Sequence, residues 1–151
     1  IPNLIFLLIA PEEMGSSEFI EPNEIKFAEK NDNFKWLRFR TDVDVLYNIS
    51  DLAVLPSYYQ EGGYPRALIE AMAFGKPVIA ADTLDCRGPV ENGVNGYLVK
   101  PRDSHDLANK IFKIFKKNSN RMKLGKNSLK KVRSEFDDKK IFNFLCDEIL
   151  G

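Results

Sequence analysis

Short apolar runs alternate along this chain with segments whose apolar residues recur at helical spacing. A short apolar run bounded by polar or turn residues is typical of a buried strand in a parallel sheet. We therefore predict strands over residues 4–9, 52–55, 78–81 and 97–99, and the alternation of residues 34–39 predicts one more strand there. The helical spacing predicts helices over 24–30, 43–49, 120–135 and 139–150, one that opens at Pro65 and closes at Gly75, and one capped by Ser104 that runs to 115. This alternation predicts the α/β class, with a Rossmann-like doubly wound parallel sheet flanked by helices.

The segment 55–82 holds a strand, a loop, a helix and a second strand, which together form the βαβ unit of a parallel sheet. Pro65 has the fixed φ that suits the first position of a helix. Gly75 is placed to end that helix in a left-handed conformation, and Pro77 prevents its continuation. The segment after the second strand, 82–91, is expected to be irregular because it contains Gly88 and Pro89.

Candidate chemistry gathers where this helix begins. The first backbone N–H groups of a helix have no partners within it and attract anions, phosphate above all. A glycine pair just before the helix lets the backbone approach a ligand closely. A carboxylate accepts hydrogen bonds from two neighbouring hydroxyls, such as those of a ribose. The segment therefore suits a phosphate flanked by sugars, as in a nucleotide-sugar, and its candidate residues are Glu61, Gly62, Gly63, Tyr64, Pro65, Arg66, Ala67, Leu68 and Glu70.

The same residues resemble a known family. Glu61-Gly62, Pro65-Arg66, Glu70-Ala71-Met72-Ala73, the run from Gly75 to Ala80 and the run from Gly93 to Val99 are similar to the donor-binding domain of retaining GT-B glycosyltransferases, family 4, also called glycosyl transferases group 1. The resemblance implies that residues 1–151 form one nucleotide-sugar (donor) binding domain with half of a GT-B fold. It also implies a fragment that lacks the N-terminal acceptor domain and transfers no sugar alone.

The resemblance assigns roles to single residues. Glu61 corresponds to a catalytic glutamate against the donor sugar and phosphates, Glu70 to a ribose-binding glutamate, and Arg40 lies in a segment that approaches the nucleobase. Two positions depart from the family pattern: eight residues rather than seven separate the two glutamates, and Gly88 stands where a glutamate is frequent. The implied donor is a UDP- or GDP-sugar, the acceptor is a glycan or a lipid-linked sugar, and no cofactor or metal is required. We expect Glu70 to face the cleft that Gly62 and Gly63 border.

A second function stays open: a non-catalytic nucleotide- or phosphate-binding α/β module, which needs no glutamate pair. A dehydrogenase domain is disfavoured because no G-x-G-x-x-G follows the first strand.

Composition bears on the classes of partner and metal site that this chain could have. The chain has 22 basic and 22 acidic residues, so no global charge draws it to nucleic acid. Its two cysteines and single histidine form no Cys-x-x-Cys or other metal-ligand pattern and fit a reducing, cytoplasmic setting. Residues 101–151 carry 13 basic and 7 acidic side chains. The Lys-rich stretch 110–140 is therefore either a solvated helical face or a peripheral contact at the inner face of the membrane.

Overall fold

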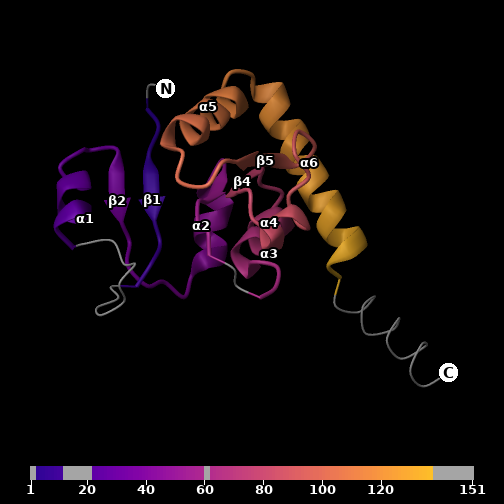
Figure 1. Ribbon diagram of the computed structural model, residues 1–151, viewed down its shortest axis with the longest axis horizontal. Coiled ribbons are helices and arrows are strands. Elements are labelled where there is room, and N and C mark those ends of the chain that lie inside the picture. Colours follow the sequence, from indigo (N-terminus) through magenta and orange to yellow (C-terminus); the bar gives the residue numbers. More distant parts are fainter. Residues whose placement is uncertain (1–2, 12–21, 60–61, 138–151) are drawn as a thin grey trace. The chain divides into compact units, whose positions relative to one another are not determined.

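The computed structural model describes residues 3–11, 22–59 and 62–137 of the chain (Figure 1). The chain divides into two compact units, residues 1–43 and 44–151. The predicted helix over 139–150 lies outside the described residues.

The first unit contains two parallel strands and one helix. Strand β1 (Phe6–Leu8) pairs with β2 (Phe34–Trp36), with Phe6 opposite Phe34, and helix α1 (Pro22–Ala28) precedes β2. Both strands and the helix were predicted, although each strand is shorter than its predicted range. The prediction that the first strand is buried is wrong, because Ile5 is 63% exposed and Phe6 is 41% exposed. One helix can cover only part of the two faces of a two-stranded sheet.

The second unit is built on a three-stranded parallel sheet. Its strands are β3 (Ala53–Leu55), β4 (Val78–Ala81) and β5 (Gly96–Val99), in the order β3-β4-β5. Every residue of the central strand β4 is buried, as expected for a strand that is apolar throughout. The helices that accompany the sheet are α2 (Val43–Ile49), α3 (Arg66–Ala73), α4 (Leu84–Arg87), α5 (Ser104–Phe115) and α6 (Asn118–Glu135). This parallel sheet with its helices confirms the predicted Rossmann-like α/β class.

Helix α3 forms one wall of the core. Leu68, Ala71 and Met72 are buried against β4 residues such as Val78, in one apolar cluster. The helix ends as the sequence predicts, because Gly75 adopts φ +66°. The Gly75 N–H donates to the Met72 carbonyl and the Lys76 N–H to the Ala71 carbonyl, which is the Schellman pattern.

Three local predictions were wrong or incomplete. The segment predicted as irregular contains α4, a helix of four residues that is too short to show helical spacing. The N-cap of α5 is Asp103, whose Oδ1 accepts the Asp106 N–H at 2.9 Å, and not the adjacent Ser104. Helix α6 begins two residues before the predicted Asn120.

None of the described helices combines the length and the apolar character needed to cross a bilayer.

Candidate functional site

The loops that follow β3, β4 and β5 all leave the sheet at one edge, because the three strands are parallel and adjacent. Ligands of open α/β sheets bind at this carboxyl edge. Residues 56–65 follow β3 and lead into α3, residues 82–83 lead into α4, and residues 100–103 lead into α5. The candidate residues of the sequence lie in the first of these loops and at the start of α3.

The start of α3 presents two open backbone donors. Pro65 is the N-cap, with φ −60° and ψ 118°, one residue earlier than the first helical position predicted for it. Its carbonyl accepts the N–H of Leu68 at 3.1 Å and of Ile69 at 3.4 Å. The N–H groups of Arg66 and Ala67 have no hydrogen-bond acceptor among the described residues. An anion at this end would meet those two groups, whereas Leu68 is buried and its N–H is already bonded.

Glu70 lies one turn into α3, on the same face as Arg66. Its side chain is 41% exposed, and its Oε1 is 3.7 Å from Nη2 of Arg66, whose side chain is 92% exposed. On the other side, Glu70 Oε2 lies 3.5 Å from the hydroxyl of Tyr47 in α2. Glu70 therefore offers an accessible carboxylate oxygen beside an exposed cation.

Tyr47 links α2 to the start of α3. Its hydroxyl donates to the Ala67 carbonyl at 3.1 Å, a shorter contact than that with Glu70. Burial first, then the negative charge and the hydrogen bond of Glu70, raise the pKa of Tyr47 to about 12.

The raised pKa predicts a loss of stability at alkaline pH. An unfolded tyrosine ionises near pH 10, so between about pH 10 and 12 the folded state holds a proton that the unfolded state has released. The contribution of Tyr47 to the free energy of unfolding is complete below pH 10 and falls as the pH rises toward 12. Urea unfolding of wild type and Tyr47→Phe across this range should give a shallower pH slope for the variant. Equal slopes would contradict the prediction.

A hollow of about 510 Å³ borders the glycine pair. Its walls are Gly62, Gly63 and Tyr64 from the loop after β3, and Leu84, Asp85, Arg87 and Gly88 from α4 and its C-cap. Glu70 is not among these lining residues, contrary to the expectation that it faces this cleft. Helix α3 turns Leu68 and Met72 into the core, and this rotation leaves Glu70 beside α2 instead.

Polar and aromatic contacts shape the hollow. The Gly62 N–H donates to Asp85 Oδ2 at 3.3 Å, and the Arg87 guanidinium pairs with Asp82 at 2.7 Å. A Cβ placed on Gly88 would lie 2.2 Å from the Tyr64 ring, so Tyr64 fills the space that a side chain at position 88 would need. The Tyr64 ring also meets Phe136 edge-on, with centroids 5.7 Å apart. Gly88 departs from the family pattern, and the absence of a side chain there leaves room for the Tyr64 ring.

The remaining predicted residues are Glu61 and Arg40. Glu61 lies outside the described residues. Arg40 belongs to the first unit, where its guanidinium donates to both oxygens of Asp42 at 2.8 and 2.6 Å. This pairing raises the pKa of Arg40 and lowers the pKa of Asp42. Within the described residues, no group of three or more His, Cys, Asp or Glu side chains is arranged to hold a metal ion.

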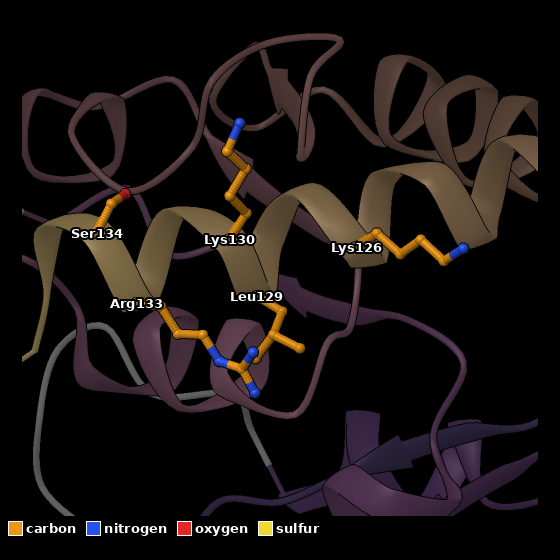
Figure 2. A pocket seen from close by; sticks show the side chains of 5 residues that line it. All are labelled: Lys126, Leu129, Lys130, Arg133 and Ser134. Atoms are coloured by element: carbon orange, nitrogen blue, oxygen red, sulfur yellow. The ribbon is translucent and has the colours of Figure 1, made fainter.

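A second hollow, of about 350 Å³, lies on α6 (Figure 2). All five lining residues, Lys126, Leu129, Lys130, Arg133 and Ser134, come from this one helix. Figure 2 shows Lys130 projecting to one side of α6 and Arg133 to the other, so the cations do not converge on a single point. This arrangement fits a solvated helical face.

Sequence reasoning overlooked Tyr58, Asp85 and Arg102, which lie in or beside the loops of the carboxyl edge. Asp85 holds Gly62, and Arg102 contacts Tyr58 from the turn after β5. The loops after β4 and β5 could have been considered from the sequence, because ligands bind at the carboxyl ends of all strands of a parallel sheet and not of β3 alone.

Comparison with known proteins places this chain in a family. The family model described as glycosyl transferases group 1 matches residues 7–131, and the chain therefore belongs to that family. It is 29% identical over 143 residues to the capsular polysaccharide biosynthesis glycosyltransferase CapM of Staphylococcus aureus, a match that covers 95% of the chain and 37% of CapM. It is 32% identical over 93 residues to the N,N'-diacetylbacillosaminyl-diphospho-undecaprenol alpha-1,3-N-acetylgalactosaminyltransferase of Campylobacter jejuni, covering 62% of the chain and 24% of that protein.

A solved structure gives the same picture of the fold. HepE of Anabaena in complex with UDP-glucose superposes with a TM-score of 0.86 at 27% identity, covering 99% of this chain and 41% of HepE. The chain thus spans less than half the length of these relatives. The recognition of a GT-B glycosyltransferase family from the motifs around α3 is confirmed.

Proposed function

We propose that this chain is the donor-binding part of a retaining glycosyltransferase that uses a nucleoside diphosphate sugar. The observation that carries the proposal is the start of α3, where two open N–H groups and the exposed Arg66 lie at the carboxyl edge, one turn before the carboxylate of Glu70. The similarity to HepE, solved in complex with UDP-glucose, supports a uridine nucleotide. A GDP-sugar is the other donor that we consider.

In this proposal the donor diphosphate meets the N–H groups of Arg66 and Ala67. Among the described residues Arg66 has one long contact, 3.7 Å from Glu70, and its guanidinium can turn to a phosphate. When the bond between the sugar and the diphosphate breaks, negative charge grows on the leaving group. The fixed N–H dipoles stabilise that charge without reorganising, and Arg66 adds a positive charge once its guanidinium has turned to the phosphate, so the proposed mechanism requires neither metal nor cofactor.

The nucleoside and the sugar extend to opposite sides of this point. Glu70 accepts hydrogen bonds from the ribose hydroxyls on the side of α2, and the sugar enters the hollow formed by Gly62, Gly63 and Tyr64 on the side of α4. Glu70 and the hollow then bind opposite ends of one extended ligand, so Glu70 need not line the hollow. The family resemblance supports Glu61 as the catalytic residue at the sugar and Arg40 as a nucleobase contact.

The acceptor would be bound by protein outside this chain. The Campylobacter jejuni relative is named for a substrate on diphospho-undecaprenol, which supports a lipid-linked acceptor, and CapM supports a polysaccharide product. We therefore propose a cytoplasmic protein that works at the inner face of a membrane, and a chain that binds donor without transferring sugar.

Isothermal calorimetry of the 151-residue chain with UDP, GDP, ADP and pyrophosphate tests the proposal. We expect one nucleoside diphosphate to bind more tightly than pyrophosphate and to raise the melting temperature, since a ligand of the folded state stabilises it. Equal affinity for pyrophosphate and all three nucleotides would favour the non-catalytic phosphate-binding module. Binding of none of them would refute both functions.

A further inference from the structure

A contact outside the predicted site joins two loops of the carboxyl edge. Nη2 of Arg102 donates to the Tyr58 hydroxyl at 3.1 Å, and the Arg102 guanidinium lies 4.4 Å from the centroid of the Tyr58 ring. Tyr58 belongs to the loop between β3 and α3, and Arg102 to the turn after β5. Because β4 lies between β3 and β5, this contact reaches across the end of the central strand.

The backbone of Arg102 is unusual for its residue type. The Asp103 N–H donates to the Lys100 carbonyl at 3.2 Å, which closes a turn with Pro101 in second place and Arg102 in third. Arg102 has φ +59°, and turns with proline second and a left-handed third residue favour glycine or asparagine there. An arginine does not favour this backbone conformation, so we look to the contacts of its side chain for its role.

The loop that Arg102 contacts is also held near its other end. The Gly62 N–H donates to Asp85, and the Ala67 carbonyl just beyond accepts the Tyr47 hydroxyl. Tyr58 attaches the early part of the loop to the turn after β5. Its ring also lies 4.7 Å from the Tyr59 ring, which adds bulk to the attachment.

We propose that Arg102 is a positioning residue that clamps Tyr58 and so restrains residues 56–59, the described segment that follows β3, at the carboxyl edge where the donor diphosphate would bind. The proposal rests on the proposed function. Residues that are already restrained lose less conformational freedom when a ligand binds, and affinity rises accordingly. A guanidinium is suited to this task because it stacks on a ring and donates a hydrogen bond at the same time.

Arg102→Gly is the decisive variant, because glycine accepts the left-handed backbone and only the side chain is lost. The matched control is Arg121→Ala. Arg121 also stacks on a ring, 5.4 Å from the Phe115 centroid, and pairs with Asp51 at 2.9 Å. Asp51 precedes β3, so this contact lies at the opposite edge of the sheet. Tyr58→Phe keeps the ring and removes the hydroxyl.

Two measurements on the 151-residue chain keep the clamp and the proposed function distinguishable. Without ligand, hydrogen exchange of peptides covering 56–66 should be faster in Arg102→Gly than in wild type and unchanged in Arg121→Ala. With UDP, calorimetry should show affinity about threefold to tenfold weaker for Arg102→Gly, an intermediate loss for Tyr58→Phe and none for Arg121→Ala. The melting temperature of Arg102→Gly should not fall, because glycine suits the turn.

Unchanged exchange of 56–66 in Arg102→Gly would overturn the clamp, whatever the ligand result. Faster exchange with undiminished UDP affinity would overturn its role in binding. Faster exchange in a chain whose wild type binds no nucleoside diphosphate would instead refute the proposed function.

Discussion

Glu70→Ala should weaken UDP binding by about tenfold to a hundredfold, because a hydrogen bond to a charged group contributes about 1.5–3 kcal/mol. The carboxylate stands half exposed beside Arg66, and neither its 3.7 Å contact with that cation nor its 3.5 Å contact with Tyr47 is tight. An incoming ribose therefore displaces little when it takes the carboxylate oxygens. Isothermal calorimetry of the 151-residue chain measures the change directly.

Pyrophosphate and 2′-deoxy-UDP make this test specific for the ribose. Pyrophosphate lacks the ribose, so its affinity should not fall in Glu70→Ala and should rise somewhat as a negative charge is removed. Wild type should bind 2′-deoxy-UDP more weakly than UDP, and the variant should bind the two alike. Glu135→Ala is the matched control, because Glu135 is also a half-exposed glutamate paired with a cation one turn earlier, Lys131, at 2.9 Å. Equal losses for UDP and pyrophosphate would place Glu70 at the phosphates instead.

Gly96→Ala should lower the free energy of unfolding by about 3 kcal/mol, at the upper end of the range for overpacked cores. Gly96 is directly opposite Val78 in the pairing of β5 with β4. A Cβ on Gly96 would lie 1.9 Å from the Val78 carbonyl oxygen and 2.9 Å from Val78 Cγ2, so the two strands would have to move apart. The oxygen is a backbone atom of the buried central strand and cannot rotate away as a side chain would.

Gly63→Ala is the control for this substitution, since a Cβ on Gly63 meets no atom of the described residues within 4 Å. Urea unfolding of both variants should show a large fall in midpoint for Gly96→Ala with an unchanged m-value, and a change within about 0.5 kcal/mol for Gly63→Ala. Similar midpoints for the two variants would mean that β5 does not approach β4 as closely as described.

The sequence was sufficient wherever a structure depends on neighbouring residues alone. The end of α3 follows from Gly75 and Pro77, because a left-handed residue and a missing N–H act within one turn. The strand 78–81 was predicted with its observed limits, since four consecutive apolar residues between polar ones suit a strand that is covered on both faces. The N-cap of α5 shows the limit of such reasoning. Asp103 and Ser104 are both good caps, and only the position of the Asp106 N–H selects between them.

By itself the sequence determined the α/β class, the family and the helix that begins after Pro65, because these depend on residue order and short-range backbone chemistry. Tertiary structure decided which side chains meet there. The rotation of α3, set by burial of Leu68 and Met72, directs Glu70 toward Tyr47 and away from the hollow beside Asp85. The parallel sheet brings Arg102 to Tyr58, which lies 44 positions earlier in the chain, because the ends of parallel strands align at one edge.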